Sequence, residues 1–377
     1  MMCKLKYVFS AVLFCITAAS AFGQSDKKIK IIFAGDIMMH QGQLESAEVK
    51  GKEMYDFSEC FKYIRPVLQQ ADLAIGNLEL TLPGNPPYLG YPIFRSPDML
   101  AGALRSAGFD MMLTANNHSN DALLEGLLHT IEALDSAGFY QTGTFESEED
   151  RAAFYPLVVY KKGFKLVFLN YTYGTNNPRD FPPAIVNKTD ETQIEKDMKE
   201  ARALSPDGII VCMHWGKEYT EEPLETEENL AAKLLEWGAT MVIGSHPHVV
   251  QPVKQFKTGE RQSDTRLVAY SLGNFISGQV KLHTDGGILL EVELTKNENQ
   301  RKAYISGYNF IPIWRYVHKG DKKVFQTLPI SMFENENNLL DMSKTDRARM
   351  MSYAKYIRDK MNAFNCRERK ISLQDIE

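Results

Sequence analysis

The sequence contains little that would indicate a disulfide-stabilised, repetitive or nucleic-acid-binding protein. Only five of its 377 residues are cysteine, and two of those lie within the first 23 residues. The remaining three are an odd number, and Cys212 lies inside an apolar segment, so no disulfide framework is implied. We find no internal repeat and no low-complexity segment. The formal net charge is -5, so the chain lacks the basic character that nucleic-acid binding requires.

The overall composition is typical of a globular protein. Hydrophobic residues make up 44% and charged residues 24% of the chain, which allows a substantial buried core. The length fits one large domain or two ordinary ones.

The first 23 residues have the pattern of a secretory signal peptide. Lys4 and Lys6 precede an apolar run of about sixteen residues, which is short for a membrane span, and Ala19-Ser20-Ala21 resembles a cleavage site. We therefore expect an exported protein, periplasmic or extracellular, from which the signal peptide is removed. A retained membrane anchor or a lipid anchor is the alternative, so membrane association stays open at this point.

From residue 29 onward, short apolar runs alternate with amphipathic segments, which predicts a layered α/β fold with much parallel pairing. The predicted strands cover residues 29–35, 71–77, 109–116, 164–173, 207–216, 239–246, 265–275 and 286–296. The predicted helices cover residues 57–70, 97–108, 121–138, 190–204, 226–237 and 344–364. The last strands follow one another without helices, so we expect mixed or antiparallel pairing there. The pattern weakens after residue 316, and we expect a helical extension over 317–377.

Polar side chains follow six of the predicted strands. Ligands in this type of fold bind beyond the carboxyl ends of the strands. The residues at these ends are Asp36 and His40, Asn77 and Glu79, Asn116 with Asn117 and His118, His214 with Glu218, His246 with His248, and Asn274.

Each of these motifs taken alone has an ordinary structural explanation. A glycine-aspartate pair at a strand end is often a turn, and an asparagine before a helix is often a cap. The segment "IGSHPHVVQP", residues 243–252, has two explanations. It is either a turn that happens to contain histidine or a pair of histidines that act as ligands. Six such motifs at the ends of separate strands favour a shared site over independent turns.

Carboxylates, amide oxygens and imidazoles together suit a divalent metal such as Mn, Zn or Fe. No cysteine is offered at these strand ends. Two ions could hold a substrate and activate a bound water molecule, and a histidine that is not a ligand could protonate the leaving group. The number and identity of the ions stay open.

The motifs "FAGDIMM", "GNLE", "TANNHSND", "MHWGKEY", "GSHPHVVQP" and "YSLGNF" resemble, in this order, those of the CapA family, which is named for poly-γ-glutamate capsules. The resemblance covers roughly residues 29–316. It implies a domain with a fold similar to calcineurin-like metallophosphatases, a four-layer α/β/β/α sandwich with mixed sheets.

The resemblance also implies roles for individual residues. It places His118 and Asp36 in catalysis, with His118 as the acid beside the leaving group. The metal-ligand positions it implies are Asp36, Glu79, Asn117, His214, His246 and His248. The substrate contacts it suggests are Arg95, Asn116, Glu218 and Asn274. The guanidinium of Arg95 would bind an anionic group of the substrate through two N–H groups. The chain departs from the phosphatase pattern at Met38, where a histidine would stand, and at Asn77 and Glu79, where aspartates would.

Three functions remain open from the sequence. The first is an exported protein that makes, exports or remodels an anionic capsule or envelope polymer, using metal-activated water to hydrolyse or transfer a γ-glutamyl or phosphoester bond. The second is a secreted metallophosphoesterase. The third is a non-catalytic binding subunit of a polymer export assembly, with other envelope proteins of synthesis and export as partners. None of the three involves nucleic acid.

Overall fold

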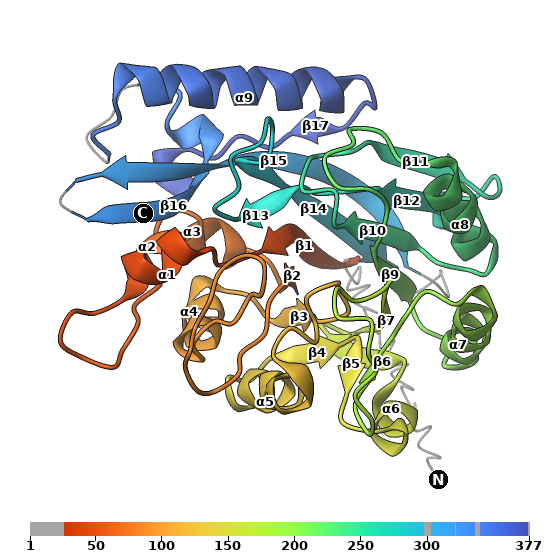
Figure 1. The fold of residues 1–377 in the computed structure, drawn as a ribbon. Coiled ribbons are helices and arrows are strands. Elements are labelled where there is room, and N and C mark those ends of the chain that lie inside the picture. Colours follow the sequence, from red (N-terminus) through yellow and green to blue (C-terminus); the bar gives the residue numbers. More distant parts are fainter. Residues whose placement is uncertain (1–25, 298–302, 321, 336–339, 376–377) are drawn as a thin grey trace, which may run out of the picture.

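Two mixed β-sheets pack face to face, with helices on the outer side of both (Figure 1). The computed structural model describes residues 26–297, 303–320, 322–335 and 340–375. This architecture confirms the predicted four-layer α/β/β/α sandwich with mixed sheets. The predicted signal peptide, residues 1–23, lies outside the described residues. Among the described residues, no helix is both long and apolar enough to span a membrane.

The larger sheet has nine strands in the described residues and carries the first half of the site. Its order is β16-β15-β14-β1-β2-β3-β4, with β13 beside β1 and β17 beside β15. β1, β2 and β3 run parallel, and β14 pairs antiparallel with β1, as the sequence predicts. β4, β15 and β16 were not predicted as strands; β4 adds a parallel pair, and β15 and β16 add antiparallel ones. The strands are β1 (Lys27–Ile37), β2 (Leu73–Leu78), β3 (Met111–Leu113), β4 (Tyr140–Thr142), β13 (Asn274–Ile276), β14 (Gly286–Lys296), β15 (Tyr304–Lys319), β16 (Lys323–Pro329) and β17 (Arg367–Glu368).

The smaller sheet has six strands in the order β11-β12-β10-β9-β7-β6 and carries the other half of the site. Its four central strands are parallel, and β6 and β11 close its edges in antiparallel pairs. The strands are β6 (Leu157–Lys161), β7 (Phe164–Thr172), β9 (Gly208–His214), β10 (Met241–Ser245), β11 (Val253–Lys257) and β12 (Thr265–Ala269); β5 (Thr144–Phe145) and β8 (Ile185–Val186) form a separate pair.

Helices cover the outer faces of both sheets. α7 and α8 pack on the smaller sheet, while α1, α2, α5 and α9 contact strands of the larger one. The helices are α1 (Gln41–Ala47), α2 (Ser58–Phe61), α3 (Arg65–Leu68), α4 (Met99–Ala107), α5 (Leu123–Ser136), α6 (Glu148–Phe154), α7 (Glu191–Ala203), α8 (Glu225–Glu236) and α9 (Lys344–Asn362), with short 3-10 turns at Gln262–Asp264 (η1), Ile330–Met332 (η2) and Leu373–Asp375 (η3).

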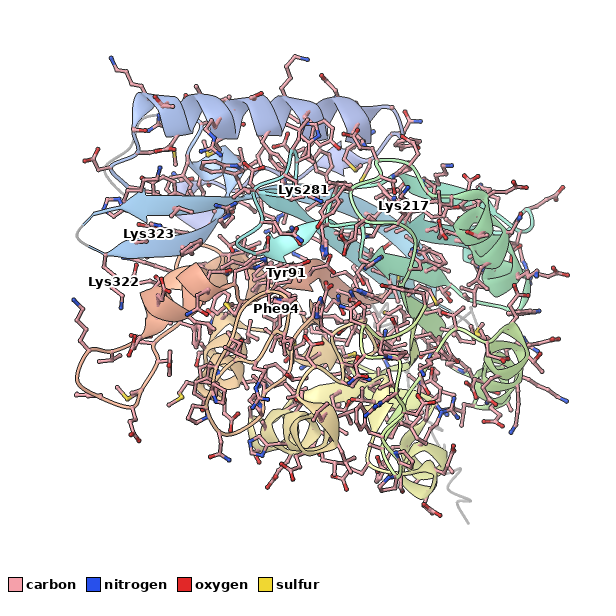
Figure 2. The ribbon with its side chains drawn as sticks, viewed as in Figure 1. Tyr91, Phe94, Lys217, Lys281, Lys322 and Lys323 are labelled. Atoms are coloured by element: carbon pink, nitrogen blue, oxygen red, sulfur yellow. The ribbon has the colours of Figure 1, made fainter. Side chains whose placement is uncertain are left out.

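The main core lies between the two sheets, where side chains from both fill the space (Figure 2). In β9, Ile210 and Cys212 face this core, whereas Ile209 and Val211 face α7 and α8. Both faces of the strand are therefore buried, which explains why its sequence is a continuous apolar run rather than an alternating one.

Two predicted elements are divided in the structure. The helix predicted over 57–70 is two short helices, α2 and α3, because Pro66 lies in the first turn of α3 and cannot continue a preceding helix. The strand predicted over 265–275 is β12 followed by β13, which lie in different sheets. The chain changes sheet at Gly273, whose φ of 69° favours glycine.

The predicted helical extension over 317–377 is wrong for its first part. The boundary after residue 316 falls inside β15, and β16 continues the larger sheet through Pro329. β15 and β16 form an antiparallel pair, in register from Ile313 with Pro329 to Lys319 with Lys323. Only α9 matches the helix expected over 344–364.

Candidate metal and catalytic site

The predicted polar residues gather where the parallel strands of both sheets end. Asp36 at the end of β1 pairs in register with Asn77 on one side and Asn274 on the other. In the facing sheet, His214 at the end of β9 pairs in register with Ser245 at the end of β10. Both sheets thus deliver their carboxyl ends to one edge of the sandwich, as the strand-end rule predicts.

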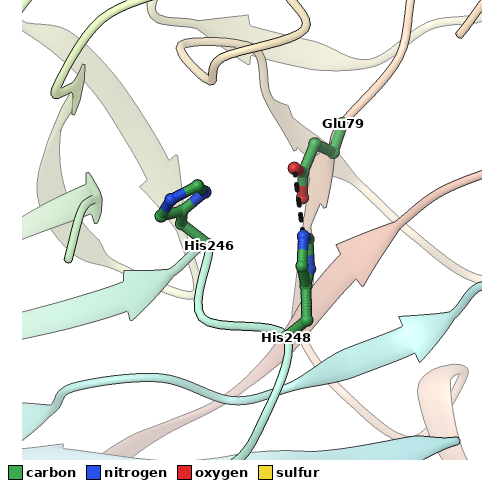
Figure 3. Close-up of side chains that lie close together, drawn as sticks. All are labelled: Glu79, His246 and His248. Carbon is green, nitrogen blue, oxygen red and sulfur yellow. Dashed lines mark ion pairs between the residues drawn. The ribbon is translucent and has the colours of Figure 1, made fainter. Parts of the chain in front are cut away.

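Glu79 and His246 carry buried polar atoms without hydrogen-bond partners. The side chain of Glu79 is fully buried, and neither carboxylate oxygen has a partner in the described residues. Nδ1 of His246 is also buried and without a partner there. Glu79, His246 and His248 converge from two separate segments (Figure 3), with ligand atoms within 4.8 Å of one another. Buried polar atoms normally have partners, so this cluster is arranged to receive something.

Asp36 fixes the orientation of His248. Nδ1 of His248 lies 2.9 Å from Oδ2 of Asp36. Because a carboxylate only accepts, Nδ1 carries the proton and Nε2 keeps a free lone pair, 3.8 Å from Oε1 of Glu79. A histidine held by a carboxylate in this way is typical of metal sites.

His214 and Asn117 hold each other through hydrogen bonds. Nε2 of His214 lies 2.8 Å from Oδ1 of Asn117, and its Nδ1 lies 3.2 Å from Nδ2 of Asn77. The same Asn77 amide donates to Oδ1 of Asp36 at 2.8 Å. Asp36, Glu79 and His214 nevertheless form a second group with ligand atoms within 4.8 Å of one another. The ligand roles of all six residues stay predictions. Among them, Glu79 and His246 carry buried atoms without hydrogen-bond partners in the described residues.

The backbone between the two histidines is strained. φ is 100° at His246 and 59° at His248, a region that non-glycine residues rarely adopt. The carbonyl of Pro247 accepts the amide of Tyr219 at 2.8 Å, which pins the loop. Such backbone outliers concentrate at functional sites. Both imidazoles of this strained loop have ligand atoms within 4.8 Å of those of Glu79.

Burial dominates the electrostatics of the cluster. It raises the pKa of Glu79 well above its usual value, and the charge of Asp36 raises it further. Burial, followed by the charge of His248, lowers the pKa of His246 to about 3. The pKa of His214 is lowered by burial and then by His246 and His248. The latter two imidazoles, His246 and His214, are therefore neutral at pH 7, the form that binds metals.

These residues fit a divalent metal. The cluster offers a buried carboxylate and two imidazoles, and both carboxylate oxygens of Glu79 and one ring nitrogen of His246 have no hydrogen-bond partner in the described residues. Nitrogen and oxygen donors of this kind suit Mn, Zn or Fe. Glu79, His246 and His248 would hold the ion, with Asp36 and His214 next to them.

His118 forms a second chemical feature beside this cluster. Its Nδ1 lies 2.7 Å from Oδ2 of Asp121, so Asp121 holds the ring in place. Nε2 lies 3.3 Å from the side-chain amide of Asn176. The ring of Phe94 packs edge-on against the imidazole at 4.7 Å between centroids. An oriented histidine with a carboxylate behind it is suited to give up or take a proton at Nε2.

Comparison with known proteins settles the family. Residues 30–279, well over half of the chain, match the family described as bacterial capsule synthesis protein PGA_cap. The chain belongs to this family. The match spans every strand-end motif described above.

Two relatives carry capsule-related names. The chain is 27% identical over 287 residues to the capsule biosynthesis protein CapA of Bacillus anthracis, covering 73% of this chain and 66% of that protein. It is 26% identical over 285 residues to the PGA biosynthesis protein CapA of Bacillus subtilis (strain 168), covering 74% and 70% respectively. The aligned part of this PGA_cap chain thus spans about two thirds of the length of these relatives.

Solved structures with a related arrangement are more distant. The calcineurin-like phosphoesterase YfkN from Bacillus subtilis has a TM-score of 0.48 at 12% identity, covering 89% of this chain and 100% of that one. A phosphatase from Mycoplasma pneumoniae has a TM-score of 0.41 at 16% identity, covering 77% and 95%. With TM-scores below 0.5, these structures support no conclusion about the activity of this PGA_cap protein.

The four residues predicted to contact the substrate lie in different surroundings. Asn116 holds its own loop, because its side chain donates to the carbonyl of Leu78 and accepts the amide of His118. Asn274 donates to Oε1 of Gln279 and to the carbonyl of Thr284. Glu218 is exposed near the cluster, where its charge raises the pKa of Glu79. All four substrate roles, including that of Arg95, stay predictions.

Arg95 lies in the loop that precedes α4. Its Nε donates to the carbonyl of Pro87 at 3.1 Å. Within the described residues, its guanidinium makes no contact with Asp36, Glu79 or the histidine cluster.

His40, whose role the sequence left open, accepts the amide of Gly278 at 3.0 Å and packs against Phe94, so its position has a structural explanation.

Three residues around the site were not predicted from the sequence. Asp121 holds His118, and Asn176 approaches it from the loop after β7. Tyr173 packs against His246 at 4.7 Å between centroids and covers the cluster from the same loop. The position of Asp121 three residues after His118 was a usable signal. Tyr173 directly follows a strand, so the strand-end rule could also have found it.

Proposed function

We propose that this protein is a metal-dependent hydrolase or transferase that acts on an anionic capsule or envelope polymer of the poly-γ-glutamate type. Membership of the PGA_cap family supports the polymer class. The signal-peptide pattern of residues 1–23 supports action outside the cytoplasm. The observation that carries the proposal is the buried cluster of Glu79, His246 and His248 beside the His118–Asp121 pair. In this cluster Glu79 and His246 carry polar atoms without hydrogen-bond partners in the described residues.

In the proposed reaction, metal binding and proton transfer fall to different residues. Glu79, His246 and His248 would hold the ion, and Asp36 keeps His248 in the tautomer that leaves Nε2 free. A bound divalent metal supplies a Lewis acid and lowers the pKa of a bound water molecule. His118, oriented by Asp121, gives a proton from Nε2 to the leaving group.

The surroundings of the cluster keep bulk water away from the reacting groups. Tyr173 lies over His246, and the cluster residues are themselves buried. Exclusion of water strengthens every charge interaction at the site.

The experiment is turnover by the purified mature protein, with and without a chelator, on three substrates. They are poly-γ-glutamate, a γ-glutamyl dipeptide and a phosphomonoester. We expect metal-dependent shortening of the polymer, lost in His118→Asn. Turnover of the phosphomonoester alone would refute the polymer assignment in favour of a phosphoesterase. Polymer binding without any turnover would refute catalysis in favour of a binding subunit.

A further inference from the structure

A cationic pocket lies beside the catalytic site in a chain whose net charge is negative. Its volume is about 330 Å³, and it lies between the loop after β13, the strands β15 and β16, and the first turns of α9. The basic side chains that line it are Lys281, Arg315, Lys319, Lys323 and Arg349. Only two lining residues are acidic, Asp285 and Asp346. The pocket therefore has a clear excess of positive charge.

The two carboxylates offset only part of this charge, and of the two it is Asp285 whose charge acts on Arg315. Oδ2 of Asp285 accepts the indole N–H of Trp314 at 3.0 Å, and Oδ2 of Asp346 accepts the hydroxyl of Ser343 at 2.7 Å. Their ion pairs with Arg349 are long, at 3.8 and 3.9 Å. Among the described residues, neither carboxylate contacts the lysines of the pocket.

Arg315 is the cation that is hardest to explain without a ligand. One of its N–H groups donates to the carbonyl of Gln279 at 2.7 Å, while its Nε is buried without a partner in the described residues. Burial lowers the pKa of this guanidinium, which means that its charge is poorly solvated. A buried cation is normally paired with an anion.

The pocket is joined to the catalytic site by one short segment. The side chain of Asn274, which pairs in register with Asp36, donates to Oε1 of Gln279, and the carbonyl of Gln279 accepts from Arg315. Lys281 lies two residues further on. Its Nζ sits 3.5 Å from the ring centroid of Tyr219, and that ring is 6.0 Å from the ring of His248.

In Figure 2, Lys281 lies toward the centre of the view, and Lys323 lies further out on the hairpin of β15 and β16. The cations thus lead from the site toward the edge of the larger sheet.

We propose that this pocket is a subsite for the substrate chain, which holds carboxylates of an anionic polymer next to the unit that reacts at Glu79, His246 and His248. The inference rests on the proposed function for its substrate class. A chain with one carboxylate per unit matches a row of cations, whereas a single small anion would need only one of them.

The test measures binding of fluorescently labelled poly-γ-glutamate by anisotropy, which needs no turnover. The variant Lys281→Gln/Lys319→Gln/Lys323→Gln removes three exposed charges from the pocket. A control, Lys50→Gln/Lys196→Gln/Lys199→Gln, removes three exposed lysines elsewhere on the surface. We expect the Kd to rise about tenfold or more for the pocket variant at low salt, and to change less than about twofold for the control.

The outcomes separate this inference from the proposed function. Equal binding by the pocket variant and the wild type, or an equal loss in the control, would overturn the subsite. Tighter binding of polyphosphate than of poly-γ-glutamate of equal charge would overturn its assignment to carboxylates. If the polymer binds through these lysines but is not cleaved, the proposed reaction fails and the subsite stands.

Discussion

Replacement of Glu79 by glutamine should stabilise the protein when no metal is present. The Glu79 side chain is fully buried, both its oxygens lack partners in the described residues, and burial and Asp36 raise its pKa well above the ordinary 4.5. Glutamine has nearly the same shape but no charge. The substitution therefore removes the cost of an ionised carboxylate that nothing in the described structure compensates.

The expected gain follows from the burial. Relief of an uncompensated buried carboxylate is worth on the order of 2–4 kcal/mol. With an unfolding entropy of about 2.1 cal/mol/K per residue, a chain of this size should gain roughly 3–5 °C in Tm. The assay is calorimetry of chelator-treated protein at pH 8. The exposed Glu236→Gln serves as the control and should shift stability by less than about 0.5 kcal/mol.

The sign of the pH dependence follows from the direction of the shift. Because the folded pKa of Glu79 lies above its unfolded value, its favourable contribution is present below about pH 4.5 and is lost as the pH rises toward the folded pKa. The difference between Glu79→Gln and wild type should therefore grow as the pH is raised from 5 to 8.

Addition of metal should make the wild type more stable than Glu79→Gln. A divalent ion at 100 times its Kd stabilises the folded state by about 2.7 kcal/mol, and only the wild type retains the carboxylate to bind it. A metal-free Glu79→Gln protein that is less stable than wild type at pH 8, or an equal metal response in both, would refute the reasoning.

Three further predictions concern residues around the site. Asp121→Asn should lower kcat about 100-fold while metal content stays unchanged, because its histidine partner loses the carboxylate that orients it; a normal kcat would contradict this. Lys360→Met should cost about 1–3 kcal/mol in chemical denaturation, because its ammonium donates to two carbonyls in the loops that carry the site, whereas the exposed Lys355→Met should cost less than about 0.5 kcal/mol. Gly35→Ala should cost at least about 2 kcal/mol, because its Cβ would lie 1.9 Å from the carbonyl oxygen of Gly273; unchanged stability would show that this contact is not as close as described.

The sequence was sufficient to predict several of the residues that meet at the site. Parallel strands that face the same way must end at one edge, so Asp36, Asn77, His214 and His246 could be placed together from their positions after apolar runs. The alternation of apolar runs with amphipathic segments predicted a layered α/β fold, and the resemblance to the CapA family implied the four-layer sandwich.

Other features depend on three-dimensional contacts that no local pattern contains. The run over 265–275 reads as one strand, since both β12 and β13 are apolar, and only the turn at Gly273 places them in separate sheets. The pairing of His214 with Asn117 joins residues 97 apart in the chain. The cationic pocket likewise draws its side chains from segments around 281, 315, 323 and 349.

The most direct test of the central claim is the metal content of the purified mature protein beside the variant His246→Ala/His248→Ala. Both proteins are loaded with Mn, Zn or Fe, freed of excess ion and analysed by mass spectrometry. We predict bound divalent metal in the wild type and its loss in the variant, with both proteins folded by circular dichroism. Absence of bound metal from a wild type that still cleaves poly-γ-glutamate, or equal metal content in the two proteins, would contradict a metal centre at these histidines.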